Sequence, residues 1–216
     1  MSQLLKRTPN TNRQRNLVQR KMTEKEKLII CISGLPGCGK STVAKKLAKK
    51  YKLNYISGGD ALKQLAIEAG YKPAERGWWE TAEGMRFLKH RLEDPFFDRK
   101  VDEKLLEMAK NGNVVLDSWT MPWLLKGKGF KVWLDASLET RAKRTAKRDG
   151  ISQGKAEALL KEREEKTRTI YEKLYGFKLG KDFSPFHLIL NTDLLDAEEV
   201  FKVLCFVIDN YVLANK

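Results

Sequence analysis

The chain has 216 residues, of which 42% are hydrophobic, and it carries a formal net charge of +14. This composition supplies enough apolar side chains for a folded core and excludes an intrinsically disordered protein. No apolar run approaches the roughly 20 residues of a membrane span, so we expect no membrane contact. Three cysteines without the spacing of a disulfide framework favour reduced thiols and a cytoplasmic location. We expect one monomeric folded domain from a chain of this length.

The N-terminal residues are predicted to lie outside that domain. Residues 1–27 hold eight Lys or Arg residues against Glu24 and Glu26, with almost no large apolar side chains. We therefore expect a flexible basic arm over 1–26 and one domain over 27–216. Such an arm can bind the phosphate backbone of RNA weakly without reading its sequence. A solvated tail, or an upstream start codon chosen in error, is the other interpretation.

The first element of the domain is an apolar strand over 28–33, which leads into a glycine-rich loop. This loop, Gly34-Leu35-Pro36-Gly37-Cys38-Gly39-Lys40-Ser41, has the pattern G-x-x-x-x-G-K-[ST], and good helix formers follow from Thr42 in a helix predicted over 40–51. The glycines let successive N–H groups turn inward, and the helix N-terminus adds partial positive charge for phosphates. We expect Lys40 to reach the β- and γ-phosphates and the Ser41 hydroxyl to ligate Mg²⁺. Residues 34–42 are therefore predicted to bind a nucleoside triphosphate.

Beyond this loop, short β patterns alternate with longer helical ones. We predict strands near 53–56, 113–117, 130–135 and 186–191, and helices near 60–69, 79–91, 97–111, 137–148, 152–175 and 196–212. The alternation predicts an α/β fold with five strands in a parallel sheet and helices on both faces. Gly150 is expected to end one charged helix, and Ser152 to cap the next.

Two helical stretches interrupt this alternation. We call them the insert, over about 60–111, and the lid, over about 141–170. Segments inserted at the carboxyl ends of parallel strands can close over a ligand and exclude water. Exclusion of water is what phosphoryl transfer to a small acceptor requires, because the triphosphate would otherwise be hydrolysed. The layout therefore favours a kinase of small molecules over a motor or a switch.

Candidate residues for metal and acceptor binding follow the second and third strands. Asp117 ends the apolar strand expected beside the phosphate loop, where a carboxylate orients Mg²⁺ in such proteins, so we predict Ser41 and Asp117 as the metal site. Asp60, at the exit of the second strand, caps the following helix or faces the acceptor, and both roles are compatible. Lys63 lies one helical turn further on and would present a cation to the phosphate of the acceptor.

Arg141, Arg144 and Arg148 share one face of the helix predicted over 137–148, because they lie three and four residues apart. Phosphoryl transfer spreads negative charge over the moving oxygens, and arginines on a lid can neutralise that charge. We predict this role for the trio, with a solvated basic face as the alternative. For Arg163 and Arg168, ion pairing along their own helix competes with such a role.

With these residues in view, residues 27–211 resemble the archaeal cytidylate kinases, which are nucleoside monophosphate kinases of the P-loop NTPase superfamily. The more specific shared segments are Ile56-Ser57-Gly58-Gly59-Asp60, Asp98-Arg99-Lys100-Val101-Asp102-Glu103, Gly112-Asn113-Val114-Val115, Trp133-Leu134-Asp135-Ala136, and Leu174-Tyr175-Gly176 ahead of Leu188-Ile189-Leu190-Asn191-Thr192. The resemblance implies a P-loop kinase fold with a monophosphate-binding helical insert and a short, arginine-bearing lid. It also implies transfer of a phosphoryl group from ATP to CMP or dCMP with Mg²⁺ as cofactor.

The resemblance also implies roles for individual residues. Lys40 serves the triphosphate, and Arg144 and Arg148 look like the arginines of the lid; we predict these three as the catalytic residues. Asp60, Arg99 and Asp102 fall in segments that surround the monophosphate.

Two predicted acceptor residues depart from the family pattern. Lys63 stands where the family usually has Arg, which keeps the charge but loses the bidentate fork of a guanidinium. Trp119 stands where the family has an arginine that is expected to hold the acceptor phosphate. It either builds the core of the insert or lies in the acceptor site, where it stacks on a base or closes a reshaped pocket. Two other functions therefore stay open, namely the same fold acting on a different small acceptor, and an RNA-associated nucleotide-binding protein.

Overall fold

The structure is a computed structural model that describes residues 27–74, 77–127 and 129–214. The basic arm predicted over 1–26 lies outside these residues. Within them, five parallel strands form one sheet in the order β2-β3-β1-β4-β5. The strands are β1 (Ile29–Ser33), β2 (Asn54–Ser57), β3 (Val114–Asp117), β4 (Phe130–Asp135) and β5 (Leu188–Asn191). The predicted α/β fold and its five strands are confirmed.

The central strand β1 pairs with β3 on one side and with β4 on the other, so that Ile30 lies opposite both Val115 and Phe130. Its side chains alternate between the two faces of the sheet. Ile32 packs in the same core as α2 (Lys40–Tyr51) and α9 (Ala197–Val207), whereas Cys31 packs with side chains of α3 (Gly58–Glu68) and α5 (Phe96–Lys110). Because β1 is covered on both faces, it reads as an unbroken apolar run rather than an alternating one.

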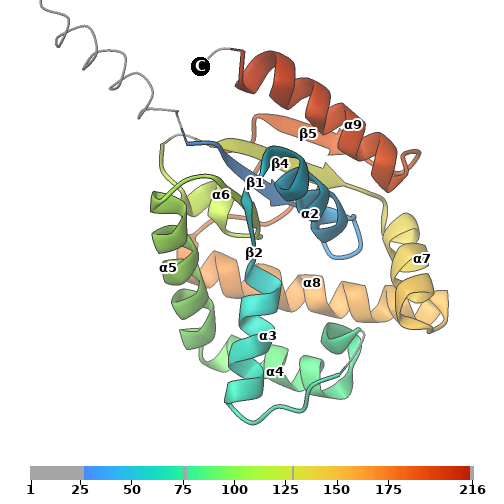
Figure 1. Cartoon of the computed structure of the whole chain (residues 1–216). Helices are drawn as coiled ribbons and strands as arrows, with labels where there is room; N and C mark the ends of the chain where they lie inside the picture. Colours follow the sequence, from blue (N-terminus) through green and yellow to red (C-terminus); the bar gives the residue numbers. More distant parts are fainter. Residues whose placement is uncertain (1–26, 75–76, 128, 215–216) are drawn as a thin grey trace, which may run out of the picture.

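The remaining helices cover the same side as α3 and α5 or form the lid (Figure 1). They are α4 (Ala82–Glu93), α6 (Met121–Leu124), α7 (Leu138–Asp149) and α8 (Gln153–Tyr175), with a 3₁₀ turn η1 (Trp78–Glu80). A π-helical turn, η2 (Ile208–Val212), continues α9 and packs in the same core as α2 and α9. Gly150 ends α7 in the left-handed conformation, and the Ser152 side chain accepts a hydrogen bond from the N–H of Lys155 at the start of α8. Both predicted helix ends are thereby confirmed.

Two local predictions are wrong. The helix predicted over 79–91 is divided, because Thr81 is extended (φ −87°, ψ 164°) and its hydroxyl caps α4 by accepting from the N–H of Gly84. The division leaves Trp78 and Glu80 in the separate turn η1. The helix α6 was not predicted at all, because four residues are too few to show a helical period.

The insert and the lid are in contact with each other. Helix α4 of the insert packs on α8 of the lid, where Leu88 meets Ile170 and Tyr171 in one apolar cluster. Helices α7 and α8 pack together through Ala142, Ala156 and Leu160 and their neighbours. In the part of the chain that the structure describes, no helix is both long and apolar enough to cross a bilayer.

Candidate active site

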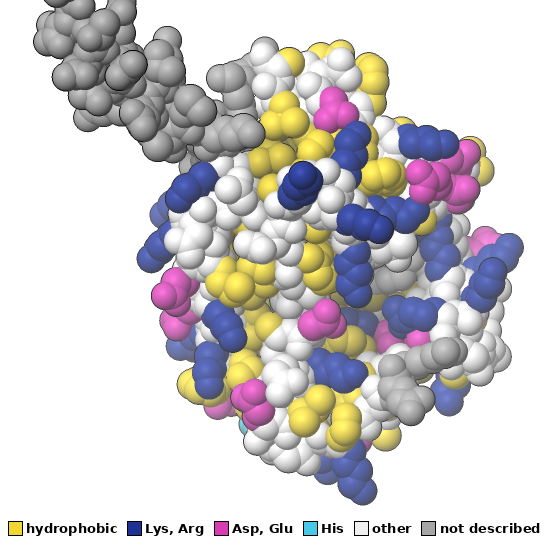
Figure 2. Space-filling model, viewed as in Figure 1, with side chains coloured by type: hydrophobic (Ala, Val, Ile, Leu, Met, Phe, Trp, Pro, Cys, Tyr) yellow, Lys and Arg dark blue, Asp and Glu magenta, His cyan; other side chains and the backbone are white. Residues whose placement is uncertain are grey.

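A cavity of about 870 Å³ lies at the carboxyl ends of β1, β2 and β3. Its walls come from the phosphate loop, the turn into α3, the insert, the segment after β3, the lid helices and the loop between β5 and α9. On the face that Figure 2 shows, Lys and Arg side chains gather over α2 and around the hollow beneath it. A single continuous space therefore connects the phosphate loop with the insert.

The phosphate loop needs glycine at two positions for steric reasons. Gly34 has φ +145°, and a Cβ there would lie 2.2 Å from the carbonyl oxygen of Leu134 in β4. At Gly37, with φ +83°, a Cβ would lie 2.8 Å from the carbonyl oxygen of Arg141. The Lys40 side chain lies along the loop, and its Nζ donates to the Leu35 carbonyl at 3.2 Å. The cavity is lined by residues 36–43 of this segment, whereas Gly34 and Leu35 form the base of the loop.

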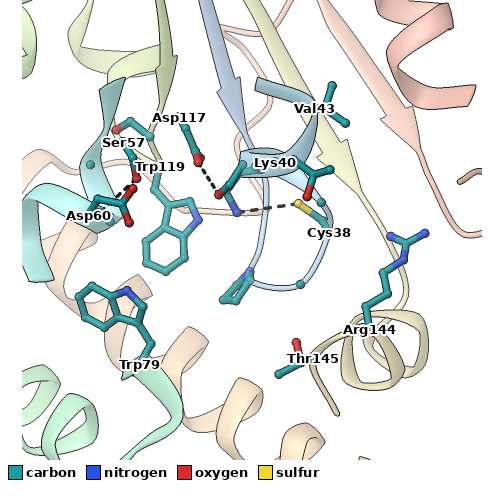
Figure 3. Close-up of a pocket in the computed structure, with 18 of the residues that line it drawn as sticks. Cys38, Lys40, Val43, Ser57, Asp60, Trp79, Asp117, Trp119, Arg144 and Thr145 are labelled. Carbon is teal, nitrogen blue, oxygen red and sulfur yellow. Dashed lines mark hydrogen bonds between the residues drawn. The ribbon is translucent and has the colours of Figure 1, made fainter. Parts of the chain in front are cut away.

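The predicted metal residues, Ser41 and Asp117, lie together at the end of the loop, and Figure 3 shows Asp117 close to Lys40. The Ser41 hydroxyl donates to Oδ2 of Asp117 at 2.5 Å, and the Tyr55 hydroxyl donates to the same oxygen at 3.1 Å. Hydroxyl and carboxylate oxygens are the donors that Mg²⁺ prefers. The described residues contain no group of three or more His, Cys, Asp or Glu side chains suited to a metal ion. The pair therefore fits a Mg²⁺ ion whose coordination is completed by water and by substrate phosphates.

Trp119 lies in the cavity wall against the phosphate loop and not in the core of the insert. Its indole N–H donates to the carbonyl of Gly34 at 2.7 Å. Lys40 Nζ lies 5.6 Å from the ring centre, and the guanidinium of Arg163 lies 5.2 Å from it. Both distances permit cation–π attraction, so the ring lies beside two cationic groups.

The neighbouring tryptophans of the insert have different roles. Trp78 is buried in the insert core, and its indole N–H donates to the Lys72 carbonyl at 2.8 Å. Trp79 instead lines the cavity, with the Arg163 guanidinium 4.8 Å from its ring centre. Figure 3 shows the rings of Trp79 and Trp119 on the same side of the hollow, below Lys40. Trp78 therefore belongs to the core of the insert, whereas Trp79 lines the cavity. The spacing of these residues in the sequence did not reveal the difference.

At the insert end of the cavity, two buried aspartates take different partners. Asp98 forms a two-bond ion pair with Arg91, with N···O distances of 2.9 and 2.5 Å. Asp102 accepts hydrogen bonds from the hydroxyls of Thr120 at 2.6 Å and Tyr175 at 2.7 Å. Burial raises the pKa of the Asp102 carboxyl to about 6, and the two hydroxyls oppose that rise.

Asp102 and Trp119 line the cavity, and of the three other predicted acceptor residues, Asp60, Lys63 and Arg99, only Asp60 does so. It is not the cap of α3, because α3 begins at Gly58 and the hydroxyl of Ser57 accepts from the Asp60 N–H at 3.0 Å. The Asp60 carboxylate therefore does not cap the helix, and Asp60 lines the cavity. Lys63 donates to the Ala74 carbonyl at 3.0 Å, and Arg99 is exposed on α5; neither lines the cavity.

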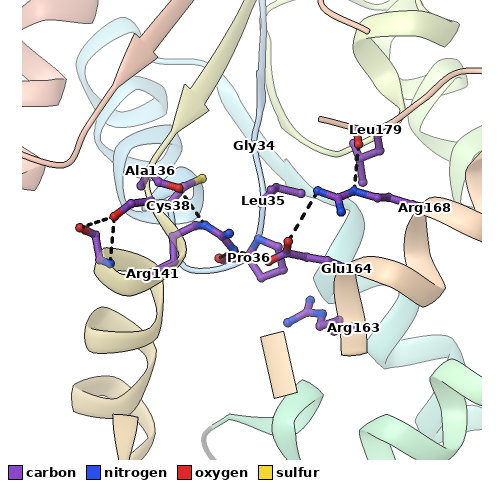
Figure 4. A network of polar contacts seen from close by, with 12 residues as sticks. Gly34, Leu35, Pro36, Cys38, Ala136, Arg141, Arg163, Glu164, Arg168 and Leu179 are labelled. Carbon is purple, nitrogen blue, oxygen red and sulfur yellow. Dashed lines mark hydrogen bonds and ion pairs between the residues drawn. The ribbon is translucent and has the colours of Figure 1, made fainter. Parts of the chain in front are cut away.

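The three arginines of α7 point to three different places despite their common helical face. Arg141 is buried, and its guanidinium donates to the carbonyls of Ala136 and Pro36 and pairs with Glu164 (Figure 4). Arg144 donates to the hydroxyl of Thr192 at 3.0 Å and to the Thr192 carbonyl at 2.6 Å, in the loop after β5. Figure 3 shows its guanidinium pointing away from Lys40.

Arg148, the third arginine, is exposed at the end of α7. Its Nη2 lies 2.6 Å from Asp149 and 3.2 Å from Glu80 of η1. Arg163 of α8 reaches the same Glu80 at 2.8 Å. Both guanidinium groups line the cavity, which also contains Lys40. Sequence reasoning did not single out Glu80 or Arg91. The partners of Glu80 lie 68 and 83 residues away in the chain, and no local motif marks Arg91.

Comparison with known proteins identifies the family. The model of the cytidylate kinase-like family matches residues 29–194. The chain belongs to this family. It is 38% identical over 186 residues to the cytidylate kinase of Pyrococcus horikoshii, covering 86% of this chain and 91% of that protein. It is 39% identical over 177 residues to the cytidylate kinase of Ignicoccus hospitalis, with coverage of 82% and 96%.

A solved structure supports the fold. The shikimate kinase from Bacteroides thetaiotaomicron matches with a TM-score of 0.53 and 18% sequence identity, covering 84% of this chain and 98% of that one. At this identity the likeness concerns the fold alone. The resemblance to cytidylate kinases inferred from the sequence motifs is confirmed by the family match.

The Arg141–Glu164 pair yields a stability prediction. In Glu164→Gln the buried guanidinium keeps its carbonyl acceptors but loses its counter-ion, and we expect the free energy of unfolding to fall by about 3 kcal/mol or more. The control is Glu162→Gln on the same helix, which removes the exposed partner of Lys166 and should change it by less than about 1 kcal/mol. Urea denaturation measures both, and equal losses would contradict a special role for the buried pair.

Asp102 yields a prediction about pH. Because the folded state raises its pKa from 3.8 to about 6, the folded protein binds this proton more tightly than the unfolded chain does. The free energy of unfolding of the wild type should therefore fall, relative to Asp102→Asn, as pH rises from about 4 to about 6, and the difference should level off above pH 7. Glu103→Gln, an exposed neighbour on α5, is the control. Parallel pH curves for wild type and Asp102→Asn would contradict the assignment.

Proposed function

We propose that this protein transfers the terminal phosphoryl group of ATP to a nucleoside monophosphate, with CMP or dCMP as the acceptor. The observation that carries the proposal is the single cavity that joins the phosphate loop to the insert, in a chain of the cytidylate kinase-like family. The cytidylate kinases to which the chain is 38 and 39% identical support this acceptor.

On the donor side, the N–H groups of residues 34–42 and the start of α2 would hold the triphosphate. Lys40 would leave the Leu35 carbonyl and bind the β- and γ-phosphates. Ser41 and Asp117 would hold Mg²⁺, which neutralises phosphate charge when bound. The loop between β5 and α9 extends the cavity beyond the phosphates, and we assign it to the nucleoside of ATP.

On the acceptor side, Asp60, Asp102 and Trp119 line the part of the cavity formed by the insert and the segment after β3. We assign the base and sugar of the monophosphate to this part, beside the rings of Trp79 and Trp119. Aromatic rings can stack on a base whatever its identity, whereas carboxylates can accept hydrogen bonds from amino and hydroxyl groups. Lys63 and Arg99 remain predicted acceptor residues that would have to move to reach the cavity.

The chemistry needs no protein nucleophile. An oxygen of the acceptor phosphate attacks the γ-phosphorus of ATP, and the bond from that phosphorus to the bridging oxygen of ADP breaks. Lys40 and the lid arginines Arg144 and Arg148 would neutralise the charge that spreads over the transferring group. Arg144 and Arg148 are now held by Thr192 and by carboxylates, so this role requires them to change partners.

The direct test is ADP release measured across CMP, dCMP, UMP, AMP and dTMP, and without an acceptor. We expect CMP or dCMP to give a kcat/KM at least 10-fold above the other monophosphates, a preference of about 1.4 kcal/mol. Deletion of residues 1–26 should leave this turnover unchanged, whereas an RNA-associated protein would lose salt-dependent RNA binding on the same deletion. ADP release that does not depend on any acceptor would overturn the proposal.

Trp119 yields a prediction about acceptor choice. Trp119→Arg removes a ring to which we assign the base and places a third cation beside Lys40 and Arg163, so the ratio of kcat/KM between CMP and the other monophosphates should change at least fivefold. Trp119→Phe keeps an aromatic ring but removes the donor to Gly34, so KM for ATP should rise while that ratio stays within twofold. An unchanged acceptor profile in Trp119→Arg would contradict a role in specificity.

A further inference from the structure

Glu80 joins the insert to the lid through two arginines. One carboxylate oxygen, Oε1, lies 2.8 Å from Nη1 of Arg163, and the other, Oε2, lies 3.2 Å from Nη2 of Arg148. The Glu80 side chain is only 4% exposed. Each oxygen of one buried carboxylate therefore serves a different lid helix, because Arg148 belongs to α7 and Arg163 to α8.

These contacts cancel the positive charge of the two arginines. Arg148 also donates from Nε and Nη2 to both oxygens of Asp149, each at 2.6 Å. Two guanidinium groups and two carboxylates sum to zero, at a wall of the cavity that Lys40 also lines. An anionic substrate that enters the cavity at this wall gains little electrostatic binding energy from the two arginines unless it displaces a carboxylate.

Arg163 has a strong requirement for such an anion. Its side chain is 12% exposed, and its guanidinium lies near the rings of Trp79 and Trp119, at 4.8 and 5.2 Å from their centres. Burial lowers the pKa of Arg163, an effect that Glu80 opposes. A guanidinium in this setting cannot lose one counter-ion without another taking its place.

We infer that Glu80 is a positioning residue whose carboxylate holds Arg148 and Arg163 until a substrate phosphate takes them over. Carboxylate and phosphate oxygens match the guanidinium fork equally well, so the two compete for the same N–H groups. That the phosphate belongs to a nucleotide rests on the proposed function; the competition itself does not.

The exchange links phosphate binding to the contact between insert and lid. Gly77, just before η1, packs so closely on Asp149 that a Cβ there would lie 2.7 Å from its carboxyl carbon. When a phosphate replaces Glu80, this side of the contact loses both ion pairs, and the freed carboxylate must reach water to be solvated. Phosphate binding is therefore coupled to the loss of the two ion pairs that join η1 to α7 and α8.

The test compares Glu80→Gln with Glu83→Gln. Glu83 lies in the same insert, pairs with Arg86 on the surface, and does not line the cavity, so its variant makes the same change of charge elsewhere. At saturating ATP we expect Glu80→Gln to lower KM for CMP 5- to 20-fold with kcat within twofold of wild type, because a neutral amide competes poorly for guanidinium groups. A KM that is unchanged or raised overturns the inference.

A second variant separates charge from shape. Glu80→Asp keeps the charge, so its KM should stay within threefold of wild type, whereas a purely structural role predicts that Glu80→Asp and Glu80→Gln behave alike. Equal KM values for these two variants would count against the inference.

A measurement without nucleotide distinguishes failure of this inference from failure of the proposed function. In Lys40→Ala, which weakens the phosphate loop, thermal unfolding is followed with and without inorganic phosphate. Adding Glu80→Gln should at least double the rise in Tm that phosphate produces, and adding Glu83→Gln should not. Equal rises with and without Glu80→Gln overturn the inference, even if CMP is a good acceptor. A doubled rise supports it, even if CMP proves not to be the acceptor.

Discussion

The whole site depends on the contacts that one buried guanidinium, that of Arg141, makes with three segments of the chain. This guanidinium donates to the Pro36 carbonyl in the phosphate loop and to the Ala136 carbonyl after β4, and it pairs with Glu164 of α8. One side chain therefore joins the loop that would hold the triphosphate, the strand beside it and the lid. A guanidinium suits this position because it carries several N–H groups in a rigid plane and stays charged when buried. A lysine there would carry its three donors on a single nitrogen and would lack the planar fork that spreads the guanidinium donors over several atoms.

Trp119 makes the corresponding connection from the acceptor side. Its indole N–H is bonded to Gly34, at the base of the same loop, while its ring lies beside Lys40 and Arg163. An arginine at this position would add positive charge, whereas the indole adds a neutral, polarisable surface between two cations. The indole therefore connects the phosphate loop with the part of the cavity that we assign to the acceptor. The two neighbouring cations are held by other groups, Lys40 by the Leu35 carbonyl and Arg163 by Glu80.

Much of this architecture could be predicted because its signals are local. The phosphate loop, the apolar strands and the helix ends at Gly150 and Ser152 each depend on residues within a few positions of one another. Prediction failed where one side-chain hydrogen bond interrupts the helical pattern. Thr81 is extended, and its hydroxyl caps α4, so the predicted helix is divided there. Prediction also failed for Asp60, where a shift of the helix start by two residues gave the capping role to Ser57.

The sequence by itself determined the fold class and the phosphate loop, because backbone geometry and apolar periodicity depend on residues that are close together in the chain. Only the tertiary structure decided what the arginines and tryptophans contact. Arg141, Arg144 and Arg148 share a helical face, yet each finds partners in a different element. The bonds from Trp119 to Gly34 and from Arg163 to Glu80 span 85 and 83 residues. Long side chains reach whatever the packed chain brings within a few ångströms, and no spacing in the sequence encodes that distance.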